Sequence, residues 1–147
     1  MPSIKTVSVV GVQDDSNRME VRAGKHTIVI DQPAGADGKD EGPTPLQFFE
    51  AALAGCIGSI ARLVARQQRI PLRGIEVAVE GPIDVDGLLG RPGAERVGFQ
   101  EFVIKVKLDA DIEAAQLPAF LAEVERRCPV SENISHPTPV RVVPATR

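Results

Sequence analysis

The order of hydrophobic patterns along this chain predicts an α+β fold with mostly antiparallel strands. Three alternating segments come before one long amphipathic segment, two more follow it, and a second helical pattern and a last strand complete the chain. Strands that come in groups, rather than alternating with helices, pair antiparallel. The length of 147 residues, with 43% hydrophobic and 25% charged content, is typical of a single domain over residues 1–147.

The N-terminal part is predicted to hold an antiparallel sheet of three strands. Apolar residues gather in 5–12, and the segments 19–23 and 25–31 alternate on either side of Gly24. The next segment, 31–43, has the sequence DQPAGADGKDEGP, a composition typical of a loop. Because it comes just before the long helical segment, this loop is a candidate lid.

The longest predicted element is a helix that begins at Thr44 and Pro45 and runs to about Gln68. Thr is a favoured N-cap and Pro a favoured first-turn residue, and Pro71 and Gly74 end the pattern. Apolar residues recur at three- and four-residue spacing, which predicts one buried face. That face consists of Leu46, Phe49, Leu53, Cys56, Ile57, Ile60 and Val64.

Small residues surround Cys56 on this helix. Gly55 and Gly58 lie beside it, and a glycine inside a helix costs about 1 kcal/mol relative to alanine. Another part of the structure is therefore expected to approach the helix closely there, while Cys56 itself faces the core.

The second half of the chain is predicted to add two strands and a second helix. The strands at 74–81 and 97–110 alternate, and the Pro- and Gly-rich segment 82–93 connects them. A helix follows from about Ile112, with Pro118 tolerated early in it. Its apolar face consists of Leu117, Phe120, Leu121, Val124 and Cys128.

The end of the chain is predicted to be a short turn and a strand. Pro129 cannot continue the preceding helix, but it can be the first residue of a new turn at 129–134. Cys128 would then be the N-cap of that turn. A final strand is expected at 139–143.

Composition excludes several functions. The net charge is −3 and the basic residues are scattered, so a phosphate backbone would not be attracted, and an aromatic share of 3% offers few rings for base stacking. We expect no nucleic-acid partner. No run of about 18 apolar residues and no leader-like N-terminus occur, which predicts a cytoplasmic protein without a membrane partner.

The two cysteines leave two interpretations open. Their spacing is not that of a metal site, and a permanent disulfide would be unusual in a reducing compartment. Free Cys is among the most buried residue types, so both could be inert core thiols. A redox pair is favoured because each sits on the apolar face of a different helix beside costly residues. A reactive thiolate also needs a nearby positive charge or helix dipole; the expected turn after Cys128 would supply a dipole to that residue, whereas Cys56 needs a cation.

Two motifs resemble the OsmC and Ohr superfamily, the osmotically inducible protein C and organic hydroperoxide resistance proteins. One is Gly-Pro-Thr-Pro-Leu at 42–46 followed by Cys56, and the other is Cys-Pro-Val-Ser at 128–131. The resemblance spans residues 25–143. It implies an intertwined homodimer in which antiparallel sheets wrap around long central helices.

The resemblance also implies a thiol-dependent peroxidase with an antioxidant role in the oxidative stress response. Cys56 would attack an organic hydroperoxide and become a sulfenic acid, and Cys128 would condense with it to a disulfide. A small dithiol or lipoyl-type reductant would restore both thiols, and no metal, flavin or other cofactor would be needed. An apolar alkyl group would suit a site lined by Leu46, Phe49, Leu53 and Ile57.

In such peroxidases an N-terminal arginine activates the thiolate and a glutamate just after the helix-start proline orients it. Arg18 and Arg22 are the candidates for the arginine, with Lys39 as a third cation. The glutamate is missing, since Leu46 and Gln47 follow Pro45. This departure resembles an OsmC-like branch whose substrates are less settled.

Three alternatives to the peroxidase stay open. The chain could be an OsmC-like binding or redox-sensing protein without efficient turnover, an interpretation that the missing glutamate favours. It could be a structural dimer with inert thiols, which a thiol titration would reveal. A hydrolase that uses Cys56 and His136 lacks a third orienting residue, and Ser135 and Pro137 place that histidine in a surface turn.

Overall fold

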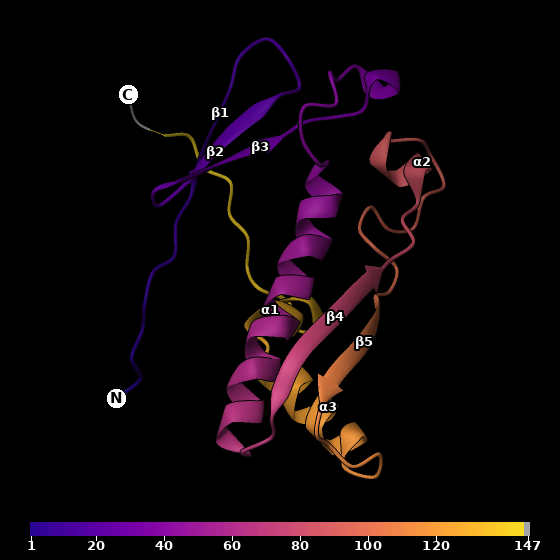
Figure 1. The fold of residues 1–147 in the computed structure, drawn as a ribbon. Coiled ribbons are helices and arrows are strands. Elements are labelled where there is room, and N and C mark those ends of the chain that lie inside the picture. The colour runs from indigo at the N-terminus through magenta and orange to yellow at the C-terminus, as the bar shows by residue number, and fades with distance from the viewer. Residues whose placement is uncertain (146–147) are drawn as a thin grey trace. The chain divides into compact units, whose positions relative to one another are not determined.

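The computed structural model describes residues 1–145, and the chain divides into two compact units, Met1–Phe49 and Glu50–Arg147. The class is the expected α+β, with antiparallel sheets and one long helix (Figure 1). The elements are, in chain order, β1 (Val10–Gln13), β2 (Met19–Ala23), β3 (His26–Ile30), the 3-10 turn η1 (Ala34–Ala36), α1 (Pro45–Gln67), β4 (Leu72–Glu80), α2 (Val85–Leu88), β5 (Val103–Ala110), α3 (Leu117–Arg127) and α4 (Pro129–Ser135).

The first unit contains the expected antiparallel sheet, in the order β1-β2-β3. Met19 pairs with Ile30 and Val21 with Ile28, so these four side chains share one sheet face, and Val21 is the most buried of them.

The first strand is shorter than predicted, because residues 5–9 lie outside it. At the N-terminal end of β1, Val10 pairs with Arg22. Just beyond that pair, Gly24, at a φ of 62°, forms the turn between β2 and β3. Beyond Arg22 only Ala23 remains in β2, so residues 5–8 have no neighbouring β2 residues with which to continue the ladder.

Helix α1 confirms the predicted start and end within one residue. The Thr44 hydroxyl accepts from the Gln47 backbone N–H at 3.3 Å, and the Gln47 side chain accepts from the Thr44 N–H at 2.9 Å, which is a capping box. At the other end Arg69 is left-handed, with a φ of 58°, and the Ile70 N–H bonds to the Ala65 carbonyl at 2.8 Å.

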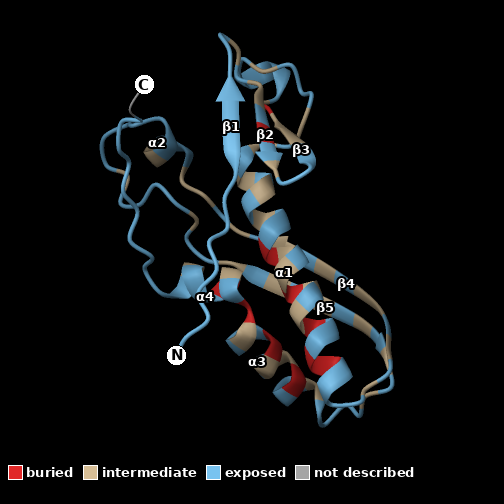
Figure 2. Ribbon diagram, turned by 90° about the vertical axis from the view of Figure 1, so that its left-hand side faces the viewer, coloured by how far each residue is buried: buried red, intermediate tan, exposed pale blue. Residues whose placement is uncertain are grey.

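The core of the second unit lies between α1, α3 and the inner face of the β4–β5 ladder, and Figure 2 shows its buried residues along the two helices. Every second residue of β5, and of β4 from Ile75 on, faces this core, as the alternation predicts; an irregularity between Leu72 and Gly74 interrupts the pattern at the start of β4. By length and composition α1 could also cross a membrane, but core helices pass the same test, and its apolar face here belongs to the core. The buried cluster consists of Leu53, Ile57, Ala61, Val64, Ala65, Phe120, Val124 and Cys128.

Strand β5 begins at Val103, later than predicted. Residues 97–102 form a loop that is joined to the residues just after β4 by an isolated bridge, Ile83 to Phe99, and by the Gln100 N–H, which bonds to the Pro82 carbonyl at 3.0 Å. The rings of Phe99 and Phe102 lie 4.5 Å apart. A Cβ at Gly81 would lie 2.7 Å from the Phe99 ring, so this aromatic pair occupies the space where the ladder would continue. Short helix α2 interrupts the predicted connecting loop.

Two further boundaries differ from the sequence prediction. Helix α3 begins at Leu117 rather than at Ile112, although Ile112 packs against the core before the helix starts. The predicted strand at 139–143 is wrong: this segment is irregular and exposed, with Val142 96% accessible. Among residues 1–145 it has no strand partner, and an unpaired apolar run does not form a strand by itself.

Candidate redox site

The site begins with the two cysteines, whose sulfur atoms the structure brings together. The Sγ atoms of Cys56 and Cys128 lie 2.8 Å apart, and both residues are free thiols. A disulfide bond measures about 2.05 Å, so the pair needs less than 1 Å of movement to close. Cys56 is half-buried and Cys128 is fully buried, at 0% exposure.

One thiol lies within a helix and the other lies at the junction of two helices. Cys56 lies on α1 between core residues Leu53 and Ile57. Cys128 closes α3, where its N–H bonds to the Glu125 carbonyl at 3.1 Å, and it opens α4, where its Sγ accepts from the Ser131 N–H at 3.4 Å. The predicted role of Cys128 as the N-cap before Pro129 is therefore confirmed.

The surroundings of Cys56 favour the protonated thiol. Burial raises its pKa above the ordinary value, and the hydrogen bond with Cys128 raises it further, while the Val130 backbone N–H acts in the opposite direction. Among residues 1–145 no Arg, Lys or His contributes to this shift. Activation of Cys56 therefore requires a cation that its own immediate surroundings do not supply.

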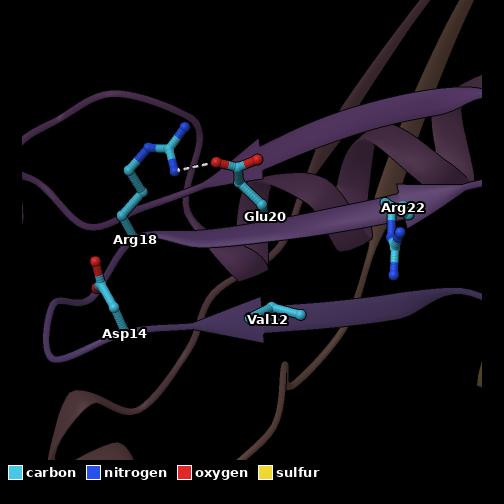
Figure 3. Close-up of a pocket in the computed structure, with 5 residues that line it drawn as sticks. All are labelled: Val12, Asp14, Arg18, Glu20 and Arg22. Atoms are coloured by element: carbon cyan, nitrogen blue, oxygen red, sulfur yellow. Dashed lines mark hydrogen bonds and ion pairs between the residues drawn. The ribbon is translucent and has the colours of Figure 1, made fainter.

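The two arginine candidates belong to the first unit, on one face of β2. Arg18 and Arg22 line an open depression of about 390 Å³ together with Val12, Asp14 and Glu20 (Figure 3). Arg22 is exposed, and in the part of the chain that the structure describes its guanidinium forms no ion pair.

Arg18 is held by two carboxylates. Its NH1 lies 2.7 Å from Glu20 Oε2 and its Nε lies 2.7 Å from Glu41 Oε2, and the Nε is shielded from solvent. The hydrogen bond to Glu20, more than any other contact, raises the pKa of Arg18. Glu41 was not a candidate from the sequence, because one glutamate among the charged residues of a loop carries no pattern that distinguishes it.

The predicted substrate-binding residues differ in exposure. Leu53 and Ile57 are core residues of the second unit, and Leu46 is half-buried. Phe49 is 45% exposed, so its predicted place on the buried face is wrong. The sequence prediction also missed the buried Ala61 and Ala65, whose small side chains let other elements approach α1.

The structure also defines the positions of two further polar residues, His136 and Glu50. His136 is the C-cap of α4, and its exposed Nδ1 lies 3.5 Å from Glu132 Oε1, in agreement with the surface turn predicted for it. Glu50, on α1, is half-buried.

The segment 31–43, the candidate lid, is a loop held by hydrogen bonds to one carboxylate. The carboxylate of Asp31, at the end of β3, accepts hydrogen bonds from three backbone N–H groups of the segment 31–43, including that of Glu41. Asp31 is 1% exposed, and the sequence prediction missed it because its partners are backbone groups with no residue signature.

The fold and the site together define a class of protein: an α+β chain whose long helix holds one thiol beside a second thiol at a helix–helix junction. The model of the OsmC-like protein family matches residues 38–143. The chain therefore belongs to the OsmC-like family.

Solved structures share this fold at low sequence identity. An OsmC-like protein from Mycoplasma pneumoniae superposes with a TM-score of 0.78 and 20% identity, covering 89% of this chain and 88% of that one. A putative osmotic stress induced and detoxification response protein from Psychrobacter arcticus gives 0.72 and 19%, covering 93% of each chain. An organic hydroperoxide resistance protein from Legionella pneumophila gives 0.61 and 23%, covering 90% and 91%. Curated protein sequences gave no match.

Proposed function

We propose that this chain is a thiol-dependent peroxidase that reduces organic hydroperoxides through Cys56 and Cys128. The observation that carries the proposal is the 2.8 Å distance between the two sulfur atoms. Membership of the OsmC-like family supports it, and similar folds include organic hydroperoxide resistance proteins from Legionella pneumophila and Elizabethkingia anophelis.

The proposed reaction proceeds on sulfur alone. The Cys56 thiolate attacks the terminal oxygen of the hydroperoxide, an S–O bond forms, the O–O bond breaks, and the departing alkoxide takes up a proton to become the alcohol. Cys128 then attacks the sulfenic sulfur, an S–S bond forms, and the hydroxyl leaves with the Cys128 proton as water. A dithiol of lipoyl type reduces the disulfide by two exchanges and is itself oxidised. These steps need no metal or flavin.

We assign the activating charge to an arginine of the first unit, Arg18 in the first place and Arg22 in the second. An opposite charge within about 4–6 Å lowers the pKa of an acid by about 1–3 units. Such a charge would offset the burial that raises the pKa of Cys56. Of the four predicted apolar residues of α1, we assign the alkyl group of the peroxide to Leu46 and Phe49, because Leu53 and Ile57 are buried in the core.

We further propose that the protein acts as a homodimer. The chain exposes 11415 Å² at a mass of 15.7 kDa. A folded monomer of this mass exposes about 7,300 Å², and two separately folded units of this total mass about 8,700 Å². Burial of the remaining surface by a second copy would account for the difference.

The exposed apolar residues support the same partner. Residues 4–12 and 140–143 carry eight of them outside any core, in segments that could each add a strand to a partner sheet. Apart from its own helix, no atom of the described chain lies within 4 Å of a Cβ built at Gly55 or Gly58, so the close approach predicted there does not come from this protomer. A cytoplasmic location, without nucleic-acid or membrane partners, belongs to the same proposal.

The test is consumption of cumene hydroperoxide with excess dithiol, for the wild-type protein, Cys56→Ser and Cys128→Ser at equal concentration. We expect rapid turnover in the wild type, loss to the uncatalysed rate in Cys56→Ser, and slower consumption of hydrogen peroxide than of the bulky peroxide. Dihydrolipoamide and glutathione compared as reductants identify the preferred thiol. A wild-type rate equal to that of Cys56→Ser would refute the peroxidase.

A binding or redox-sensing protein without efficient turnover is the second candidate. The raised pKa of Cys56 and the absence of a cation among the causes of that shift favour it. It predicts that one equivalent of peroxide oxidises both cysteines over minutes, with no faster turnover when dithiol is added. Stopped-flow oxidation of the thiols separates the two candidates by rate.

A further inference from the structure

We propose that Asp31 is a positioning residue that sets the Arg18 guanidinium by holding the loop that carries Glu41. This inference rests on the proposed peroxidase, in which Arg18 activates Cys56. The Asp31 carboxylate binds the backbone of the loop 31–43, and Glu41 of that loop binds Arg18. All of these contacts lie within the first unit.

The Asp31 carboxylate organises the loop through backbone contacts. Oδ1 accepts from the Gln32 N–H at 2.8 Å, and Oδ2 accepts from the Lys39 N–H at 3.2 Å and the Glu41 N–H at 3.1 Å. The carboxylate is almost entirely buried, and a buried charge is tolerated only when such donors surround it. The oxygen that accepts from Glu41 therefore fixes the backbone of the residue that binds Arg18.

Backbone contacts close the same loop around Asp31. The Asp31 N–H bonds to the Pro43 carbonyl at 3.2 Å and the Asp40 N–H bonds to the Gln32 carbonyl at 3.0 Å. A Cβ at Gly38 would lie 1.8 Å from the Gln32 carbonyl oxygen, and one at Gly42 would lie 2.3 Å from that of Val29. The loop thus packs against the end of β3 too closely for any larger residue at these two positions.

Glu41 is the member of the loop that reaches the arginine. Its carboxylate forms an ion pair with the shielded Nε of Arg18 at 2.7 Å, without hydrogen-bond geometry, while Glu20 accepts a hydrogen bond from the outer NH1. Two carboxylates on different sides limit the rotation of the guanidinium. Glu20 lies in β2, two residues after Arg18, so Glu41 is the contact that depends on the loop.

The groups around Asp31 stabilise its ionised form, which is the form that accepts hydrogen bonds from the loop. The Glu41 N–H is the largest cause that lowers the pKa of Asp31, followed by the Gln32 N–H, and Arg18 lowers it further through space. Asp31 is therefore ionised at neutral pH and accepts hydrogen bonds at both oxygens. Asparagine would present an NH2 group to one set of backbone donors and lose at least one of these bonds.

The experiment measures the pKa of Cys56 from the pH dependence of iodoacetamide alkylation, with Cys128→Ser as the common background so that one thiol remains. We compare Asp31→Asn, Glu41→Gln, Arg18→Gln and Asp40→Asn. Asp40 lies in the same loop at a φ of 57°, a conformation that Asn adopts readily, so Asp40→Asn is the matched control.

We expect Asp31→Asn, Glu41→Gln and Arg18→Gln each to raise the pKa of Cys56 by about 1 unit, and Asp40→Asn to leave it unchanged. In enzymes that keep Cys128, the same three substitutions lower kcat/KM about tenfold at a pH below that pKa, because the thiolate fraction falls about tenfold. Hydrogen exchange at the Lys39 and Glu41 amides speeds up in Asp31→Asn alone.

The results distinguish a failure of the positioning role of Asp31 from a failure of the proposed peroxidase activity. If Arg18→Gln raises the pKa and neither Asp31→Asn nor Glu41→Gln does, the positioning role is wrong and the peroxidase stands. If Arg18→Gln has no effect, the assignment of Arg18 fails and the inference fails with it. Should Asp31→Asn not fold, an unchanged Cys56 pKa in Glu41→Gln overturns the inference, because Asp31 acts on Arg18 only through Glu41.

Discussion

At the scale of single residues, Cys56 and Cys128 have different surroundings although their sulfur atoms lie 2.8 Å apart. Cys56 is partly exposed and Cys128 is fully buried. A peroxide arriving from solvent therefore meets Cys56 first, which agrees with Cys56 as the attacking thiol and Cys128 as the resolving one.

This asymmetry predicts the products of one oxidation without reductant. Cys128→Ser treated with one equivalent of cumene hydroperoxide and dimedone should gain one dimedone adduct at Cys56, because no second thiol condenses with the sulfenic acid. The wild-type protein should lose both thiols and gain no adduct. Peptide mass spectrometry checks this, and a wild-type adduct as abundant as that of the variant would exclude Cys128 as the resolving thiol.

The lowered pKa of Asp31 predicts that the free energy of unfolding falls at acidic pH. Its pKa is lowered in the folded protein, so its contribution is present above the unfolded pKa of about 3.9 and is lost as the pH falls through the lower folded value. We expect the difference in unfolding free energy between the wild type and Asp31→Asn to shrink below about pH 4. Urea unfolding at pH 7 and pH 3 measures it. An undiminished difference at pH 3 would show that the Asp31 charge is not the cause.

At the scale of elements, α1 depends on its N-terminal cap. Thr44 and Gln47 satisfy each other's backbone N–H groups there. Thr44→Ala should lower the free energy of unfolding by about 1 kcal/mol, whereas Thr44→Asp should retain most of it, since Asp also caps. Urea unfolding followed by circular dichroism measures both variants. Equal losses in the two would show that the hydroxyl does more than cap the helix.

The second helix pair places Cys128 by a different physical route. Pro129 lacks an N–H, so α3 must end before it and α4 can begin at it, and the residue between the two helices takes an extended conformation with φ −79° and ψ 109°. The sequence order Cys-Pro therefore decides which residue lies at the junction. Packing of Phe120 and Val124 on the core then sets how close that junction comes to α1.

At the scale of the whole molecule, the proposed dimer makes a prediction about Gly55. Gly55→Leu should disrupt the dimer because its side chain would occupy the space that we assign to the partner. It should not weaken the helix itself, since Leu is a better helix former than Gly by about 0.8 kcal/mol or more. Light scattering should give about 31 kDa for the wild type, twice the 15.7 kDa of the chain, and a lower mass for the variant.

Glu113→Leu is the control for that measurement. Glu113 is exposed just before α3, so the variant adds a leucine to the surface outside α1. It should keep the wild-type mass. A monomeric wild type, or a Gly55→Leu protein as large as the wild type, would contradict the proposed interface.

Local patterns in the sequence determined much of this structure. The α+β class, the span of α1, the alternation of β4 and β5 and the N-cap role of Cys128 follow from caps, prolines and hydrophobic periodicity, which act over a few residues. The family resemblance carried by the two cysteine motifs is confirmed over residues 38–143. The roles of Cys56, Cys128, Arg18 and Arg22 stay predictions.

Only the tertiary structure decided the contacts between segments far apart in the chain. The distance between the two sulfurs depends on the packing of α3 on α1, and the pairing of Arg18 with Glu41 depends on how the Asp31 loop folds back. Residues 5–8 and 139–143 have the composition of strands but no neighbour within the described chain. A strand exists only where another strand offers hydrogen bonds, and composition alone does not specify that neighbour.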